Sequence, residues 1–221
     1  TKYLAGHGTT LGGVVVESGR FPWDNGKFPG MTEPSPGYHG VRFYETFGDF
    51  GFTMRCRMES LRVFGAALSP TSAWQILQGV ETLPLRMEKH NENALAVAAF
   101  LESDPRVAYV NYPGLPSHPQ HALLRAQMSG ASGLLAFGVK GGLSAGVQFI
   151  EGAQMMSHPV NIGDTRTLIS HPASTTHRQL DEAQQIAAGV HPDMVRISVG
   201  LEHIDDILWD IDQALSSANT A

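Results

Sequence analysis

The sequence predicts a mixed α/β fold, because stretches typical of strands and stretches typical of helices follow one another along the chain. Short, mainly apolar runs that favour strands occur at 11–16, 134–139 and 195–199, and the first of them is rich in β-branched residues. Longer stretches carry apolar residues near helical spacing, above all 83–101 and 204–215. A chain of 221 residues is also long enough to bury the core of one large or two small domains.

The N-terminal part is expected to contain a turn, a strand and a long loop. Residues 11–16, Leu-Gly-Gly-Val-Val-Val, form a run bounded by glycine and polar residues, which predicts a buried strand. Lys2 would then lie on the turn before that strand. From Trp23 to Tyr38 the chain is dense in Gly, Pro, Asn, Asp and Ser. Irregular excursions of this length are often functional.

Two helices are expected in the middle of the chain. One follows Ser69-Pro70, and the other spans 83–101 and is long enough to join two domains. We therefore expect residues 1–80 to be the end of a first domain. Residues 81–221 are expected to form the joining helix and a small α+β domain.

The expected elements of that small domain alternate between strand and helix. They are a strand at 106–112, a loop at 113–119, a strand at 134–139, a helix at 143–156, a strand at 195–199 and a closing helix at 204–215. Asp205 and Asp206 would lie in the first turn of the closing helix, where the helix dipole favours negative charge.

Composition excludes several classes of partner. The net charge of −6 offers no broad basic surface for nucleic acid, and no stretch is apolar enough to cross a membrane. The single cysteine, Cys56, cannot form an internal disulfide, which favours a cytoplasmic location. The sequence opens on Thr1 without a leader, so we expect a part of the protein upstream of it.

Local chemistry alone suggests two candidates near the start of the chain. A free N-terminal threonine can act as a nucleophile with its own amine as the base, so Thr1 allows an N-terminal-threonine hydrolase. A lysine amine in a tight turn, such as Lys2, can lose solvation and form an imine with a carbonyl compound. His171 and His177 are interpreted as loop residues that hydrogen-bond backbone, and no metal site is assigned.

Three strings in one order resemble the cystathionine γ-synthase-like family of Cys/Met-metabolism enzymes, which depend on pyridoxal 5'-phosphate. The first is Thr1-Lys2-Tyr3-Leu4-Ala5-Gly6-His7-Gly8. The second runs from Asn161 to His177, and the third is Val-Arg-Ile-Ser-Val-Gly-Leu-Glu at 195–202. Together the strings reach both ends of the chain, so the resemblance covers essentially all of it.

The resemblance implies an aminotransferase-like fold of type I, with 1–80 as the end of the large cofactor domain. It implies that Lys2 holds pyridoxal phosphate and that Thr1 contacts the cofactor phosphate. It also implies that Arg196 binds the substrate α-carboxylate, with Asn161 as a second donor and Thr167 lining the same pocket. A guanidinium fork suits that role because it grips a carboxylate with two parallel hydrogen bonds.

A further resemblance bears on the reaction. The excursion from Trp23 to Phe52 is similar to an insertion that marks the O-acetylhomoserine sulfhydrylases of this family. These enzymes replace the acetate of O-acetylhomoserine by sulfide or a small thiol, which gives homocysteine or methionine. Methionine γ-lyase and cystathionine γ-synthase are the alternatives within the family.

The resemblance also implies partners that this sequence does not supply. Family members are homo-oligomers, dimers that pair into tetramers, with active sites shared across the dimer. The N-terminal half that completes the cofactor site is absent from this sequence. A truncated, inactive scaffold is therefore the alternative from another class.

Overall fold

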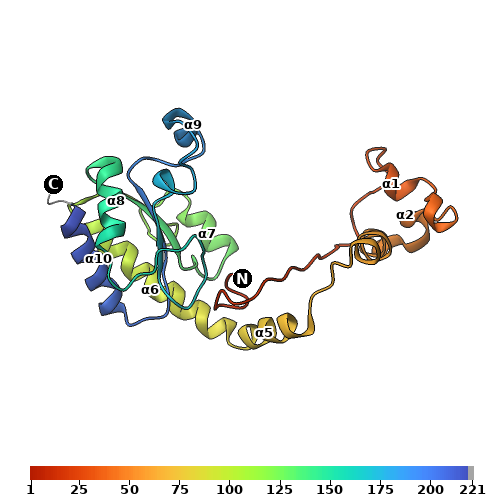
Figure 1. Cartoon of the computed structure of the whole chain (residues 1–221), viewed down its shortest axis with the longest axis horizontal. Coiled ribbons are helices and arrows are strands. Elements are labelled where there is room, and N and C mark those ends of the chain that lie inside the picture. The colour runs from red at the N-terminus through yellow and green to blue at the C-terminus, as the bar shows by residue number, and fades with distance from the viewer. Residues whose placement is uncertain (219–221) are drawn as a thin grey trace. The chain divides into compact units, whose positions relative to one another are not determined.

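The computed structural model describes residues 1–218, and its contacts divide the chain into two compact units (Figure 1). One unit combines Thr1–Thr10 with the chain from Gln75 onward, and the other is Leu11–Trp74. Among the described residues, no helix is long and apolar enough to cross a membrane. The boundary expected near residue 80 stays a prediction, and residues 219–221 of the expected small domain lie outside the described part.

The first unit contains a four-stranded antiparallel sheet with the strand order β1-β2-β4-β3. Its strands are β1 (Val107–Asn111), β2 (Leu134–Val139), β3 (Leu168–Ser170) and β4 (Met194–Ser198). The strands predicted at 106–112, 134–139 and 195–199 are therefore confirmed. Strand β3 was not predicted, because three residues are too short a run to show a period.

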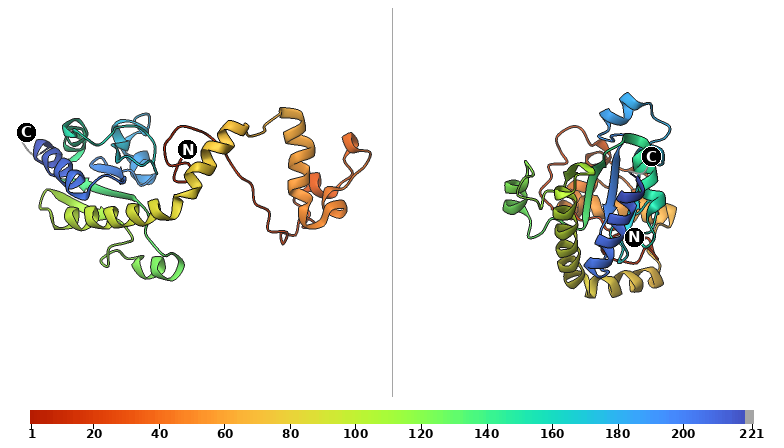
Figure 2. Two further views of the ribbon diagram at one scale, coloured as in Figure 1. Left: turned by 90° about the horizontal axis from the view of Figure 1, so that it is seen from below. Right: turned by 90° about the vertical axis from the view of Figure 1, so that its left-hand side faces the viewer.

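Helices α6 (Leu83–Ser103), α8 (Gly142–Gly152) and α10 (Ile204–Ala218) lie together on one side of this sheet (Figures 1 and 2). They share one core with the inward side chains of β2 and β4. Leu135 pairs with Ile197 in that core, and Phe137 pairs with Val195. The three predicted helices are confirmed, except that α8 ends at Gly152 rather than near residue 156.

The remaining helices of this unit are short. They are α7 (His121–Gln127), α9 (Glu182–Ala187) and the 3-10 turn η4 (Pro172–Ser174). Helix α5 (Pro70–Glu81) forms where the Ser69-Pro70 signal predicts it. Asp205 and Asp206 lie in the first turn of α10, as expected from the helix dipole.

The second unit is a set of short helical segments. They are α1 (Pro29–Thr32), η1 (Pro36–Tyr38), α2 (Phe43–Phe47), η2 (Gly48–Phe50), α3 (Gly51–Arg55), the π-helical turn η3 (Cys56–Leu61) and α4 (Arg62–Phe64). The excursion predicted to be irregular therefore contains two short turns, α1 and η1. Trp23 stacks on Phe52 at 5.2 Å, and Phe43 is fully buried.

The buried strand predicted at 11–16 is wrong. This segment has no strand pairing, and the side chains of Leu11, Val14, Val15 and Val16 are exposed. A strand needs a neighbour to accept and donate its ladder hydrogen bonds. No strand among the described residues pairs with 11–16, so the β-branched run remains extended and uncovered.

Candidate active site

Strand β4 places one cation at the edge of the hydrophobic core. Val195, Ile197 and Val199 are fully buried, and the alternation of a strand turns Arg196 and Ser198 to the opposite face. Arg196 keeps part of its side chain accessible. The apolar residues on either side of it thus anchor the strand while the guanidinium remains available to a ligand.

The segment before β3 brings Asn161 to this arginine. The Ser198 hydroxyl accepts a hydrogen bond of 2.8 Å from the Gly163 backbone nitrogen, and Arg196 Nη2 donates to the Asn161 carbonyl oxygen at 3.4 Å. Gly163 has a φ of +68°, and a side chain there would come within 2.7 Å of the Tyr3 backbone nitrogen. The Asn161 segment therefore packs directly on the turn that carries Lys2.

Lys2 completes this group of candidate site residues. The Gly6 backbone nitrogen donates to the Lys2 carbonyl oxygen at 2.8 Å, which closes the turn, and Lys2 Nζ donates to Asn161 Oδ1. Because the amide oxygen of Asn161 faces the amine, its NH₂ group is left to donate elsewhere. The structure thus brings Lys2, Asn161 and Arg196 together from three distant parts of the sequence.

The charges around this group favour an anion. Burial lowers the pKa of Arg196, yet the guanidinium stays protonated at neutral pH. Among residues 1–218, no carboxylate lies within ion-pair distance of it. A partly buried cation without a counter-charge is a ready site for a carboxylate or a phosphate.

A buried acid on the same segment as Asn161 is already paired with another residue. Asp164 is 1% exposed, and its carboxylate accepts hydrogen bonds from the Arg166 backbone nitrogen and Nε at 3.0 and 3.1 Å. Burial alone would raise the pKa of Asp164. The pKa nevertheless lies below its ordinary value, because Arg166 hydrogen-bonds to the charged form of the carboxylate. Asp164 therefore remains an anion paired with Arg166.

Two of the predicted site residues make other contacts. The Thr1 hydroxyl donates to the Thr10 carbonyl oxygen at 3.0 Å. Thr167 is fully buried; its hydroxyl donates to Glu202 at 2.8 Å and accepts from the Gly200 backbone nitrogen at 2.9 Å. Neither hydroxyl contacts Lys2, Asn161 or Arg196 among the described hydrogen bonds.

Sequence reasoning missed the residues that support the group. Ser198, which holds the Asn161 segment, and Arg86, which bonds to the carbonyls of Tyr3 and Leu4, were not singled out. Arg86 did leave a signal, since it is a charged residue on the helix face that we expected to be apolar.

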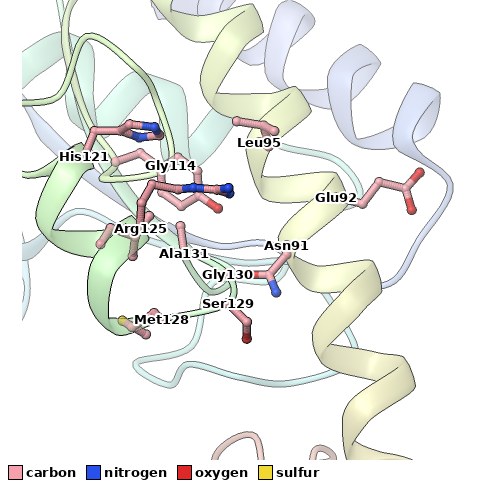
Figure 3. A pocket seen from close by; sticks show the side chains of 12 residues that line it. Asn91, Glu92, Leu95, Gly114, His121, Arg125, Met128, Ser129, Gly130 and Ala131 are labelled. Carbon is pink, nitrogen blue, oxygen red and sulfur yellow. The ribbon is translucent and has the colours of Figure 1, made fainter.

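A separate cavity of about 230 Å³ lies between α6, α7 and the segment 128–131 (Figure 3). Asn91, Leu95, His121 and Arg125 are among its lining residues. None of the predicted site residues lines this cavity. It is therefore distinct from the group around Lys2.

Comparison with known proteins supports a specific family. The model of a family described as Cys/Met metabolism PLP-dependent enzymes matches residues 1–216. The chain is 50% identical over 217 residues to O-acetyl-L-homoserine sulfhydrylase 1 of Thermus thermophilus, covering 98% of this chain and 52% of that protein. It is 47% identical to a homocysteine synthase of Schizosaccharomyces pombe, covering 99% of this chain and 52% of that protein.

A solved structure agrees with the fold. A Campylobacter jejuni protein named as an O-acetylhomoserine (thiol)-lyase, with N'-pyridoxyl-lysine-5'-monophosphate, superposes with a TM-score of 0.90 at 39% identity. The match covers 98% of this chain and 52% of that one, so the chain spans about half the length of the proteins it resembles. The expected aminotransferase-like fold is confirmed, and the chain belongs to the family of Cys/Met metabolism PLP-dependent enzymes.

Proposed function

We propose that Lys2 holds pyridoxal 5'-phosphate and that the complete protein is an O-acetylhomoserine sulfhydrylase. In this reaction the bond between Cγ and the acetate oxygen breaks and a bond from Cγ to sulfur forms. Hydrogen sulfide plus O-acetylhomoserine gives homocysteine plus acetate and a proton. A small thiol such as methanethiol gives methionine in the same way.

One observation carries the proposal: Arg196 is a partly buried cation without a carboxylate partner in residues 1–218, beside Asn161 and Lys2. An amino-acid substrate brings the α-carboxylate that Arg196 lacks. The planar guanidinium can hold both oxygens of that carboxylate, and the free NH₂ of Asn161 can donate a further hydrogen bond.

The residues present also fit the cofactor. The Lys2 amine is exposed and contacts a neutral amide, so no ion pair competes with a covalent bond to an aldehyde. When bound, pyridoxal phosphate supplies the electron sink for the chemistry at Cα and Cβ. Lys2 Nζ, once released by the substrate, can move the proton from Cα.

The names of the relatives support the substrate. A sulfhydrylase and a homocysteine synthase at 50% and 47% identity both imply sulfur transfer to a four-carbon amino acid. The activity is proposed for the complete protein, since the chain spans about half of the length of these relatives.

The test is the reaction of the complete, cofactor-loaded protein with O-acetylhomoserine and sulfide, followed as homocysteine and acetate. Arg196→Lys is expected to raise KM for O-acetylhomoserine about 10- to 100-fold, because a point charge replaces a bidentate grip. Arg178→Lys, at an exposed arginine, is the matched control and should leave KM unchanged.

Rival activities are outcomes of the same assay. Release of an α-keto acid from methionine would instead indicate a γ-lyase, and use of cysteine as the sulfur donor would indicate a cystathionine γ-synthase. Either result without homocysteine formation from sulfide contradicts the proposal.

We also propose that residues 1–80 end the large cofactor domain and that 81–221 form the smaller one. On this proposal the complete protein is a cytoplasmic homotetramer, a dimer of dimers whose active sites need its N-terminal half and a neighbouring subunit. Light scattering on the complete protein tests the assembly. A monomer that retains full activity would contradict the shared site.

A further inference from the structure

Helix α6 carries three buried polar side chains on one face. Arg86, His90 and Asn93 follow one another at spacings of four and three residues, which aligns them along the helix. Their exposed fractions are 6%, 0% and 0%. We call these three residues the polar stripe.

Arg86 grips the turn that carries Lys2. Its Nη1 donates to the Tyr3 carbonyl oxygen at 2.8 Å, and its Nη2 donates to the Leu4 carbonyl oxygen at 3.3 Å. Nη2 also donates to the Gly79 carbonyl oxygen of α5 at 2.5 Å. No carboxylate of residues 1–218 pairs with this guanidinium, and Nε donates to the Thr82 hydroxyl at 3.2 Å. Its remaining hydrogen bonds go to backbone oxygens of the turn and of α5.

The fit around this guanidinium is tight. A side chain at Gly6, where φ is +79°, would come within 2.5 Å of Arg86 Nη1. A side chain at Gly79 would come within 2.4 Å of the Ala5 carbonyl oxygen. The Lys2 turn is thus seated directly on α5 and clamped by Arg86, with little room to shift.

The other two members of the stripe hold the chain that follows Arg196. His90 Nδ1 donates to the Val199 carbonyl oxygen at 2.7 Å. Asn93 Nδ2 donates to the carbonyl oxygens of Gly200 and Glu202, both at 3.0 Å. The His90 ring also meets the Tyr3 ring edge-on at 5.2 Å, so the middle of the stripe contacts the Lys2 turn as well.

We propose that the polar stripe is a positioning device, which fixes Lys2 and Arg196 relative to each other by holding the backbone beside each of them. The inference rests on the function proposed for these two residues. The stripe itself touches neither reacting group, so its members are positioning residues. Arg86 acts on the amine and Asn93 acts on the carboxylate site, and the two variants therefore have different kinetic signatures.

Arg86→Lys keeps the positive charge but removes the forked guanidinium that bonds to several carbonyl oxygens at once. In the complete, cofactor-loaded protein we expect kcat to fall about 100-fold with KM within about threefold of wild type, because a small misplacement of a catalytic group costs about this much. Asn93→Ala is expected to raise KM for O-acetylhomoserine about 10-fold with a smaller change in kcat. Arg178→Lys serves as the control for an arginine on the surface.

Hydrogen exchange supplies a readout that does not depend on activity. In Arg86→Lys we expect the peptide spanning residues 1–10 to exchange more than about 10-fold faster, since the Gly6 amide bonds within the clamped turn. The peptide containing β2 (Leu134–Val139) should exchange as in wild type. Faster exchange everywhere would indicate general destabilisation and would overturn the inference, as would kinetic constants equal to those of wild type.

The proposed function is checked separately in the wild-type protein by borohydride reduction. A pyridoxyl group on wild-type Lys2, together with unchanged exchange of residues 1–10 in Arg86→Lys, overturns only the positioning role. Absence of that group overturns the proposed function and this inference with it.

Discussion

Among residues 1–218, most of the buried apolar side chains lie in the unit that contains the Lys2 group, whereas the unit formed by Leu11–Trp74 contributes only Met31 and Phe43. In the first, Phe137 and Phe149 are fully buried and meet edge-on at 5.4 Å within one core. In the second, Val16 and Phe64 are 85% and 82% exposed. The lesson lies in the run at 11–16: β-branched residues favour a strand, but burial also requires a neighbouring strand, and no described strand pairs with this run.

The largest effect is expected from truncating the core of the first unit. Phe149→Ala removes a fully buried ring and leaves a cavity, so we expect the free energy of unfolding to fall by about 3–5 kcal/mol. Phe64→Ala, at an exposed ring of the second unit, should change it by less than about 0.5 kcal/mol. Urea denaturation of both variants measures the two changes in the free energy of unfolding. Similar losses in the two variants would contradict the contrast between the units.

A smaller effect is expected within the second unit. The Glu17 carboxylate accepts hydrogen bonds from the backbone nitrogens of Phe52 and Thr53 at 3.1 and 2.8 Å, and from the Thr53 hydroxyl at 2.9 Å. Glu17→Gln should cost about 1 kcal/mol locally, because part of the contact faces solvent. Faster hydrogen exchange in 43–64 with no change in 134–139 would sharpen the comparison, and no change in either segment would contradict it.

The buried histidines of the first unit should give its stability a pH dependence. Burial lowers the pKa of His90 below 6.5, against the raising effect of its bond to Val199 and with further influence from Arg86, Glu202 and Asp164. The unfolded chain therefore binds the proton more readily, so stability is present above about pH 6.5 and is lost as the pH falls through the lowered pKa.

The measurement is the free energy of unfolding between about pH 7.5 and about pH 5, a range that brackets the ordinary histidine pKa. His90→Gln should flatten the slope in part only, because burial also lowers the pKa of His171. A slope identical to wild type would show that His90 is not the titrating group.

The smallest effect is expected at the segment that was predicted to be a strand. Val15→Lys or Val16→Lys in the 221-residue chain should change the free energy of unfolding by less than about 0.5 kcal/mol, since both side chains are exposed. A loss of several kcal/mol would mean that this segment is buried by a partner. That result would remove the contrast between the two units.

Most of the fold of the first unit could be predicted because its signals are local. The helices at 83–103 and 204–218 repeat apolar residues over several turns, and residues 195–199 alternate between apolar and polar. The error at 11–16 has a non-local cause, since strand pairing depends on residues elsewhere in the chain. Helix α9 was missed although Asp181 and Gln184 form its capping box, because only six residues follow this signal.

The candidate site was predictable in part. Lys2, Asn161 and Arg196 were singled out from their motifs, and the structure brings them together. Motifs could not reveal the polar stripe on α6, because its members contact backbone carbonyls far away in sequence. Such contacts leave no pattern except polar residues at helical spacing in a face that is otherwise apolar.

The measurement that tests the central claim most directly is borohydride reduction of the complete, cofactor-saturated protein, followed by peptide mapping with mass spectrometry. Reduction traps a cofactor on the lysine that holds it. The account predicts a pyridoxyl group on Lys2 and none on Lys27 or Lys89. An unmodified Lys2, or a group on another lysine, would contradict it.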